Sequence, residues 1–344
     1  MQAVFKYGLD KIELENIEKF CNSVDYCSIE QSVGWSQLFY KSKICYFYLF
    51  DESGIKSFSQ INEGVKSAQI YFGPVCCEKE VMITSINEII HYYKKRGFYY
   101  LGIQMYYKSG YDTDYIEYAL NKLYNIKYIF NNQNTKSSIE INLENSIEEI
   151  WRNFREGHKK SVKKAQKMGL TINEVKDLSE LETFMEINSK MCKARHISDN
   201  SFVSRNIIKI FNYLIENNRG RILLAKDRDG IVVGGDMLVY QGNSVIMYKG
   251  ATDPDRRDLP ISHLLIYEAI IKAKNDQFKY FDFWGYNHFA DKNDQVYYIN
   301  QFKKGFGGYY TFFGKKMNIS LVPYGYNIFK IFITFQTFLQ QILK

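Results

Sequence analysis

The sequence predicts an α/β fold of the α+β kind, made of two tandem subdomains of similar design and a C-terminal helix. In the second half, three runs rich in β-forming residues, 221–227, 231–240 and 244–251, are joined by short turns that contain Asp-Gly and Gly-Asn, which are signals of β-hairpins. A loop, a helix over 262–274 and a short strand over 280–284 follow. We therefore expect each subdomain to contain a mixed, mostly antiparallel sheet that is flanked by helices.

The first half of the chain repeats this order more weakly. The segment 51–54, Asp-Glu-Ser-Gly, is a hairpin signal, and 71–74 (Tyr-Phe-Gly-Pro) stands where 248–251 (Tyr-Lys-Gly-Ala) stands later. Such self-similarity favours an internal duplication, and the alternative is that two unrelated α/β halves share generic patterns. The duplication predicts subdomains over 1–144 and 145–320, followed by a C-terminal helix over 321–344.

A long amphipathic helix is expected at the start of the second subdomain. Ser146 and Glu149 have the spacing of a capping box, apolar residues then recur at helical spacing, and Gly169 is typical of a helix end. The opposite face, over 152–167, is rich in Lys and Arg. This face either contacts the phosphates of tRNA or of membrane lipids, or is only solvated.

Length, charge and cysteine content limit the class of protein. The 344 residues are 46% hydrophobic and 24% charged, which is ordinary for a globular protein with more than one small core. The net charge of +7 favours polyanionic partners such as nucleotide phosphates, a lipid pyrophosphate, tRNA or an anionic membrane surface, and DNA is not expected. The six cysteines form no C-x-x-C pair or zinc-like cluster, which predicts reduced thiols, a cytoplasmic location and no metal site.

Targeting and membrane-spanning segments are not evident in the sequence. The N-terminus lacks the apolar core of a signal peptide, and no run of about 18 apolar residues occurs. The stretch 327–344 is apolar around much of a predicted helix. It would pack on the body of the protein or lie on the inner surface of the membrane as a peripheral contact. Walker and dinucleotide-binding motifs are also missing.

Several segments resemble the Fem family of peptidoglycan bridge aminoacyltransferases (FemA, FemB and FemX), which belongs to the GNAT acyltransferase superfamily. Their order and spacing carry the resemblance over about residues 30–315. The segments are Gln31 to Trp35, Gly73 to Val75, 151–169, 184–195, 280–285 (Tyr-Phe-Asp-Phe-Trp-Gly) and 302–308 (Phe-Lys-Lys-Gly-Phe-Gly-Gly). The resemblance implies two tandem GNAT-like subdomains and a role in joining an acyl or aminoacyl group to an amine on a cell-envelope precursor.

Two features depart from the family members that act on peptidoglycan. Those members often carry an acid followed by Pro after the strand equivalent to 101–103, where this chain has Gln104 and Met105. The chain also has no long coiled-coil arm in its second half. The resemblance is therefore to the short members of the family, or to simpler GNAT relatives that use acyl-CoA.

Amide formation requires a neutral amine, stabilisation of the tetrahedral oxyanion and close placement of both substrates. Placement contributes about 7–11 kcal/mol of barrier reduction, and each oxyanion donor about 3–4 kcal/mol. Lys303 is the first candidate, because it follows Phe302 and precedes the Gly-rich turn 305–308. A lysine at this place would stabilise the oxyanion or steer the phosphate of an acyl carrier. The resemblance matches Phe302 and Lys303 to the functional pair of the family. The alternative is a solvated surface lysine.

Two aspartates stand on predicted strands, where an unpaired charge is costly. Asp282 is flanked by Phe281 and Phe283, and we expect it to act as a catalytic base or to anchor an arginine. Asp236 follows Gly235 in the middle of a strand, which favours a place in the substrate cleft, although the sequence assigns no chemical role to it.

Four further residues are expected to bind substrate. Tyr248 on the third strand would line the acceptor groove, unless it belongs to the core. By resemblance, Arg195 would bind an anionic group of the acceptor through its forked donors, unless it only complements the dipole of its helix. The resemblance also places Trp35 and Gln104 in the substrate-binding groove.

The donor is expected to bind near Arg256, Arg257 and Ser262. These residues stand at the place where GNAT enzymes bind the pyrophosphate of CoA, and a helix N-terminus attracts phosphate in any case. The Gly-rich motif that is usual there is not met. The donor is therefore aminoacyl-tRNA or acyl-CoA, and no permanently bound cofactor is expected.

Three functions stay open from the sequence. The first is a Fem-like aminoacyltransferase that uses aminoacyl-tRNA on a lipid-linked or nucleotide-linked envelope precursor. The second is an acyl-CoA-dependent N-acetyltransferase that acts on an amino sugar of a surface polysaccharide with acetyl-CoA as donor. The third is a non-catalytic module that binds a glycan or tRNA. Turnover with one donor separates the first two, and binding without turnover indicates the third.

Overall fold

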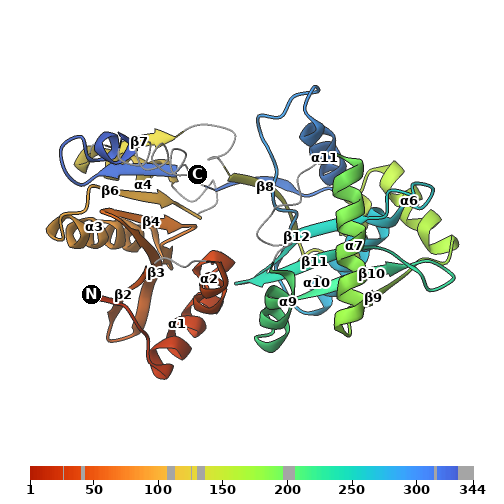
Figure 1. Cartoon of the computed structure of the whole chain (residues 1–344), viewed down its shortest axis with the longest axis horizontal. Coiled ribbons are helices and arrows are strands. Elements are labelled where there is room, and N and C mark those ends of the chain that lie inside the picture. Colours follow the sequence, from red (N-terminus) through yellow and green to blue (C-terminus); the bar gives the residue numbers. More distant parts are fainter. Residues whose placement is uncertain are drawn as a thin grey trace, which may run out of the picture. The chain divides into compact units, whose positions relative to one another are not determined.

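The structure, a computed structural model, describes residues 1–25, 27–39, 43–106, 113–124, 126–129, 136–196, 206–313 and 316–331. The chain divides into two compact units, which Figure 1 shows: Met1–Lys136 with Phe312–Lys344, and Ser137–Thr311. Each unit has its own sheet with flanking helices, which confirms the predicted fold class. The division differs from the expected boundaries at 144 and 320, because strand 136–142 joins the sheet of the second unit and strand 316–320 joins that of the first.

The sheet of the first unit has the strand order β1-β2-β3-β4-β6-β15-β7, and β5 pairs with β3. Its described strand pairs are antiparallel except for β4 and β6, which are parallel. The strands are β1 (Gln2–Lys6), β2 (Lys43–Asp51), β3 (Gly54–Gly64), β4 (Ser67–Tyr71), β5 (Val75–Cys76), β6 (Tyr100–Gln104), β7 (Ile126–Ile129) and β15 (Lys316–Ser320).

Helices of the first unit pack apolar faces on this sheet. They are α1 (Lys11–Ser23), the 3-10 turn η1 (Ile29–Gln31), α2 (Val33–Phe39), α3 (Lys79–Lys95) and α4 (Thr113–Leu123). In α3 the buried residues Met82, Ile86, Ile89 and Tyr93 recur at helical spacing and belong to the core. The first helix begins with a capping box between Asp10 and Glu13.

The predicted C-terminal helix over 321–344 falls mostly outside the described residues. Residues 325–331 are helical, and the residues that follow are not described. Within the described part of the chain, no helix combines the length and apolar character that crossing a lipid bilayer requires.

The sheet of the second unit has the strand order β14-β8-β13-β12-β11-β10-β9. Within it β12 and β13 are parallel, whereas the other pairs with a described register are antiparallel. The three predicted strands and the two hairpins between them are confirmed to within one residue at each end. The strands are β8 (Lys136–Asn142), β9 (Thr171–Glu174), β10 (Gly220–Lys226), β11 (Val232–Gln241), β12 (Ser244–Thr252), β13 (Tyr280–Asp282) and β14 (Tyr309–Phe313).

Two glycines let helices approach both faces of this sheet closely. An added Cβ at Gly234 would lie 2.8 Å from Ile261, and one at Gly235 would lie 2.8 Å from Phe184 on the opposite face. Helix α10 therefore covers one face and α7 the other (Figure 1). The helices of this unit are α5 (Ile147–Asn153), α6 (Glu156–Lys167), α7 (Leu178–Ala194), α9 (Ile207–Glu216), α10 (Ile261–Asn275) and α11 (Gln295–Lys304).

The capping box at Ser146 is confirmed, but the single long helix predicted after it is wrong. The backbone N–H of Glu149 donates to Ser146 Oγ at 3.2 Å, and Glu149 accepts from the Ser146 N–H at 2.9 Å. The helix then breaks at Phe154 and Arg155, which both have extended backbones. The break buries the Phe154 ring in the core, 5.1 Å from that of Phe306, and directs the Arg155 N–H to the Gly305 carbonyl at 2.8 Å.

Candidate active site

The parallel strands β12 and β13 separate soon after they meet. They pair over three residues, the last pair being Ile246 and Asp282, and β12 then continues without β13 but still paired with β11. On its other side, the register between β12 and β11 shifts after Met237, which makes Tyr248 the extra residue of a β-bulge. A cavity of about 790 Å³ lies at this place and is lined by residues of β11, β12, α10 and α11 and by the C-terminal end of α7. We call it the main cavity.

The main cavity brings together six predicted site residues that are far apart in the sequence. They are Arg195, Asp236, Tyr248, Ser262, Phe302 and Lys303. Helices α10 and α11 and strands β11 and β12 each bring at least one of them, and Arg195 directly follows α7, so the cavity exists only because the fold assembles these elements.

Lys303 is held in the wall of the main cavity by two backbone carbonyls. Its side chain is buried, and Nζ donates to the carbonyl oxygens of Trp284 and of Gly285, the latter at 3.2 Å. These two bonds use two of the three ammonium protons. Burial lowers the pKa of Lys303 to about 8, while the nearby Asp282 carboxylate acts in the opposite direction. Lys303 is therefore a positioned cation with one donor remaining, not a solvated surface lysine.

The turn that carries these carbonyls is anchored by Asp282. Trp284 and Gly285 have φ of 48° and 57°, in the left-handed region that is unfavourable for a tryptophan. Asp282 Oδ1 accepts from the Trp284 N–H at 2.7 Å and from the Ser138 hydroxyl. Asp282 is 0% exposed and is not among the residues that line the main cavity. Of the two expectations for Asp282, the structure supports an anchor, with a backbone turn in place of an arginine.

Phe302 belongs to an aromatic cluster with two histidines that sequence reasoning did not identify. His158 Nε2 contacts the Phe302 carbonyl oxygen at 2.9 Å, and the His158 and His263 rings are 4.8 Å apart. Burial lowers the pKa of both histidines, that of His263 to about 4, so both are neutral at physiological pH. They come from α6 and α10, and no spacing in the sequence indicates that they meet.

Asp236 is a buried carboxyl in the same cavity wall. It stands on β11 opposite Gly250 of β12, and an added Cβ at Gly250 would lie 2.2 Å from Asp236 Oδ1. Burial raises the pKa of Asp236 from 3.8 to about 7. The expectation that this aspartate faces a cleft agrees with its position in the main cavity.

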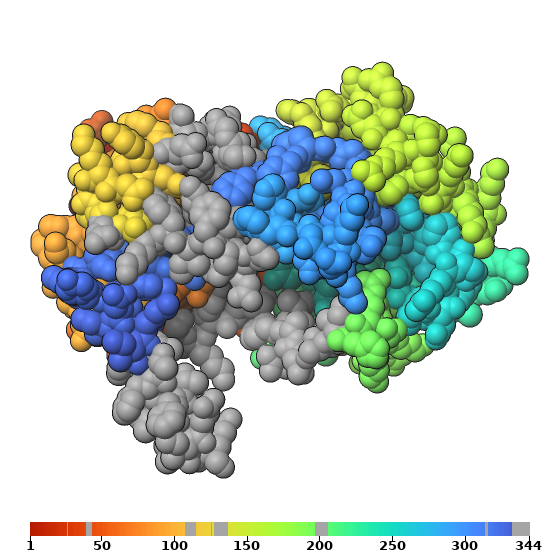
Figure 2. All heavy atoms as spheres, turned by 90° about the horizontal axis from the view of Figure 1, so that it is seen from above, coloured from red at the N-terminus to blue at the C-terminus, as the bar shows by residue number. Residues whose placement is uncertain are grey.

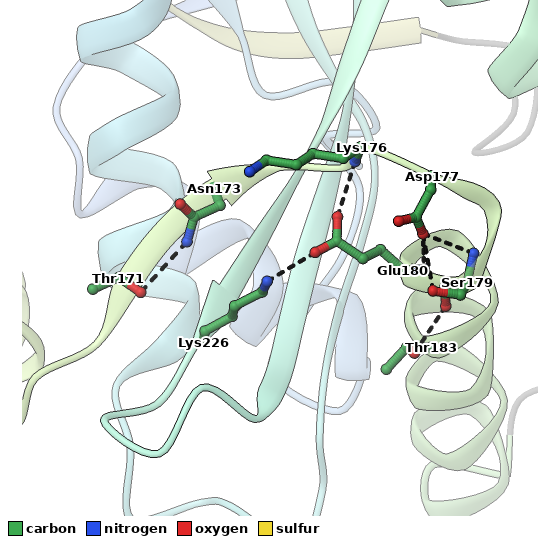
Figure 3. A network of polar contacts seen from close by, with 8 residues as sticks. All are labelled: Thr171, Asn173, Lys176, Asp177, Ser179, Glu180, Thr183 and Lys226. Carbon is green, nitrogen blue, oxygen red and sulfur yellow. Dashed lines mark hydrogen bonds and ion pairs between the residues drawn. The ribbon is translucent and has the colours of Figure 1, made fainter.

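The position of Arg195 depends on how α7 is anchored at its other end. Figure 3 shows the network at the start of the helix, where Asp177 accepts from the backbone N–H groups of Ser179 and Glu180, each at 3.0 Å. Glu180 in turn accepts from the Lys176 N–H at 2.9 Å and from Lys226 Nζ on β10 at 2.8 Å. These bonds tie the first turn of α7 to the sheet.

Arg195 follows the last residue of α7 and is exposed at the edge of the main cavity. Its backbone N–H donates to the Met191 carbonyl at 3.1 Å, which closes the helix. The side chain lines both the main cavity and an adjoining one. This placement is compatible with the expected binding of an anionic group.

The second cavity, of about 610 Å³, contains the predicted donor-binding residues Arg256, Arg257 and Ser262. Arg256 Nη1 forms an ion pair with Asp227 Oδ2 at 2.7 Å, and this pair stabilises the loop before α10. Arg257 Nε donates to the Pro254 carbonyl at 3.1 Å. The N-cap of α10 is Pro260, which provides no side-chain cap, so the first N–H groups of α10 remain available to an anion. Of the predicted site residues, Arg195, Ser262 and Phe302 line both cavities.

Trp35 and Gln104, both predicted to bind substrate, are buried in the first unit. Trp35 on α2 is 0% exposed. Gln104 ends β6, where it lies between Tyr71 of β4 and Lys316 of β15 in the sheet, and is 6% exposed. Both side chains are therefore buried, and their expected role in substrate binding stays a prediction. In the described part of the chain, no group of three His, Cys, Asp or Glu side chains is suited to a metal ion.

Parts of the chain are similar in sequence to known proteins. Residues 152–298 match the family model of the acetyltransferase (GNAT) domain. Over 87 residues the chain is 33% identical to a lipid II:glycine glycyltransferase of Staphylococcus haemolyticus, a match that spans 25% of this chain and about a fifth (21%) of that relative.

Two solved structures with a similar fold are FemX and a tandem GNAT protein. FemX has a TM-score of 0.78 at 15% identity and covers 92% of this chain and 97% of its own. The tandem GNAT protein, from the clavulanic acid biosynthesis pathway, has a TM-score of 0.52 at 9% identity and covers 94% of this chain and 99% of its own. Residues 152–298 thus match the GNAT domain in sequence, and the fold of the whole chain is similar to that of FemX.

Proposed function

We propose that this protein is an acyltransferase that forms an amide between an activated aminoacyl group and an amine of a lipid-linked peptidoglycan precursor. The observation that carries the proposal is the fixed position of the Lys303 ammonium group in the wall of the main cavity. The glycyltransferase of Staphylococcus haemolyticus, which is named for lipid II, supports a peptidoglycan precursor as the acceptor. A nucleotide-linked precursor carries the same amine and is the nearest alternative.

Lys303 would stabilise the tetrahedral oxyanion. When the amine attacks the donor carbonyl, negative charge develops on the carbonyl oxygen, and the third ammonium proton of Lys303 is available to it. The carbonyl groups of Trp284 and Gly285 already fix the position of Nζ. The ammonium group therefore needs no reorganisation as the charge forms, and hydrogen-bond donors that are preorganised in this way contribute most to catalysis. Phe302 and the two neutral histidines would keep the surroundings of this charge low in water.

The donor is proposed to be aminoacyl-tRNA. The exposed residues Arg152, Lys160, Lys163 and Lys167 form a basic face around α6. This part of the chain (yellow-green) lies on one face of the second unit beside the segment that contains α11 (blue) in Figure 2. A polynucleotide could contact such a face while its aminoacyl end enters the main cavity.

Acyl-CoA is the second candidate donor. The uncapped N-terminus of α10 in the second cavity would accept a pyrophosphate, and the matching family model describes acetyltransferases. The basic face around α6 would then be solvated or would contact anionic lipids. With a lipid-linked acceptor, we propose that the protein works in the cytoplasm at the inner surface of the membrane.

Label transfer tests the function. Purified protein is incubated with lipid II and either labelled aminoacyl-tRNA or labelled acetyl-CoA, and the same donors are tested with amino-sugar precursors. We expect label in lipid II from aminoacyl-tRNA. Lys303→Ala should lower the rate of transfer by about 10²–10³-fold. Lys304→Ala, which removes the exposed neighbouring lysine of the same helix, should keep the wild-type rate.

Three outcomes would contradict the proposal. Transfer from acetyl-CoA alone would identify the second candidate donor. Tight binding of lipid II or tRNA without turnover of any donor would indicate a non-catalytic module. Full activity of Lys303→Ala would exclude the oxyanion role of Lys303.

A further inference from the structure

Asp236 is a buried acid in the main cavity, and one of its two carboxyl oxygens receives no hydrogen bond from the described residues. Its side chain is 5% exposed. Oδ1 lies against the backbone of Gly250, and the buried Oδ2 accepts no hydrogen bond from the described part of the chain. A carboxylate that is kept without donors in the interior is destabilised, so such a group is expected to have a partner that arrives with the substrate.

The main cavity offers that partner a defined place. Asp236 faces it together with Lys303, the proposed oxyanion donor, and with the bulge residue Tyr248. We propose that Asp236 binds the primary ammonium group of the acceptor and takes one of its protons before the amine attacks. This inference rests on the proposed function and adds the residue that makes the nucleophile neutral.

The proton balance of the step is complete without another reactant. One proton passes from the acceptor ammonium to Oδ2 of Asp236, which leaves a neutral amine and a neutral carboxylic acid. The amine nitrogen forms a bond to the donor carbonyl carbon, and the oxyanion is held by Lys303. The intermediate collapses as the bond from carbon to the leaving oxygen or sulfur breaks, and the leaving group takes the second proton from the nitrogen. Asp236 returns its proton to solvent after product release.

The acid–base properties of the cavity fit this transfer. Burial alone raises the pKa of Asp236 to about 7. The amine of Lys303, in the same cavity, has a pKa lowered to about 8, which indicates what burial does to an amine there. Burial of a bound acceptor amine would lower its pKa in the same direction, toward that of Asp236, and proton transfer is most efficient between groups of similar pKa.

The other titratable groups around Asp236 come from the elements that pack on β11 and line the cavity. They are Arg195 and His196 after α7, Tyr248 and Lys249 on β12, and Tyr298 and Lys303 on α11. Helix α10 contributes Ser262 and Ile266 to the lining, which do not titrate in this range. Asp236 is therefore the one carboxyl among the described residues that line the main cavity.

The pH profile of acceptor use tests the inference. With saturating donor, kcat/KM for the acceptor is measured between about pH 5.5 and 9.5 for the wild type, Asp236→Asn and the control Asp229→Asn, which changes an exposed turn. We expect the wild-type rate to rise through an apparent pKa near 7. Asp236→Asn should be about 10²–10⁴-fold slower and should lack this acid limb, whereas Asp229→Asn should resemble the wild type.

A nucleophile that needs no base separates a chemical role from a structural one. Hydroxylamine is largely unprotonated at neutral pH, so Asp236→Asn should form the hydroxamate from the donor at nearly the wild-type rate. Slow reaction of Asp236→Asn with both nucleophiles, or an acid limb unchanged in the variant, would overturn the inference. If the wild type itself transfers nothing to either nucleophile, the proposed function fails instead, so the two failures are distinguishable.

Discussion

The two units share an order of elements but differ at the parallel strand pair near the centre of each sheet. In the first unit β4 and β6 pair along five residues, from Ser67 and Tyr100 to Tyr71 and Gln104. In the second, β12 and β13 pair along three and then separate. The main cavity lies where the second pair opens. In this scaffold, a cavity therefore forms where the parallel strand pair ends after three residues. Where the corresponding pair is longer, the sheet stays closed.

The same contrast holds for one buried acid in each unit. Glu63 on β3 accepts hydrogen bonds from Tyr7, Tyr93 and Arg96 at 3.0, 2.9 and 2.5 Å. Asp236 on β11 has a buried oxygen that accepts nothing from the described residues. The first acid is satisfied by the fold, which is typical of a structural role, whereas the second lines the main cavity, where the proposed acceptor ammonium would bind it.

Removal of Glu63 is expected to have the largest effect on stability. Glu63→Ala leaves the Tyr93 hydroxyl and the Arg96 guanidinium without their acceptor, and breaking a buried pair in this way costs about 3–5 kcal/mol of unfolding free energy. Urea unfolding followed by circular dichroism measures it, with Glu52→Ala in an exposed turn as the control. A loss below about 1 kcal/mol, the range of exposed ion pairs, would show that this cluster is not structural.

Asp236→Asn should instead stabilise the protein at high pH. The folded-state pKa of about 7 lies above the unfolded value of 3.8, so the folded state holds the extra proton between these values and stability falls as pH rises through this window. Asparagine cannot ionise and avoids the loss, which is at most about 4 kcal/mol above pH 7. Unfolding free energies at about pH 5 and 8.5 measure the difference. An advantage of the variant that is no greater at the higher pH would contradict the burial of a charge at this site.

Gly250→Ala should move the Asp236 carboxyl without removing it. The added Cβ would lie 2.2 Å from Asp236 Oδ1, so the carboxyl must shift, and a misplacement of about 1 Å costs roughly 10²-fold in rate. Steady-state kinetics measure the loss, with Gly102→Ala in the first unit as the control, because its Cβ would be 3.3 Å from the flexible Gln69 side chain. In the Asp236→Asn background, Gly250→Ala should add little. An equal loss of rate in both backgrounds would show that the effect of Gly250→Ala does not depend on Asp236.

The sequence predicts those parts of the fold that depend on local signals. Asp-Gly and Gly-Asn turns define the hairpins of the second unit, and Ser146 marks a helix start, because these preferences act within a few residues. The break at Phe154 depends on a core pocket and on the Gly305 carbonyl, which is distant in the sequence. Local periodicity cannot contain such information, and the helix was therefore predicted to be continuous.

The candidate site was predictable to a similar degree. The choice of Lys303 rested on the resemblance and that of Asp236 on the cost of a charge on a buried strand, and both residues line the main cavity. Trp35 is buried although the resemblance placed it in the substrate-binding groove, because a motif identifies a segment but does not say whether its side chain is exposed. The pairing of His158 with His263 depends on the packing of α6 on α10, which only the assembled fold reveals.

The smallest predicted effect is on stability and concerns the first turn of a helix in each unit. Here we expect the two units to respond alike. Asp10 in the first unit and Ser146 in the second are both N-caps in a capping box. Asp10→Ala and Ser146→Ala should each cost about 1 kcal/mol of unfolding free energy, while Asp10→Ser and Ser146→Thr, which keep an oxygen at the cap, should cost less than half of that. Urea titrations measure all four variants. If an alanine variant lowers the activity with lipid II and leaves the unfolding free energy unchanged, its helix start contributes to the function of its unit and not only to the stability of the scaffold.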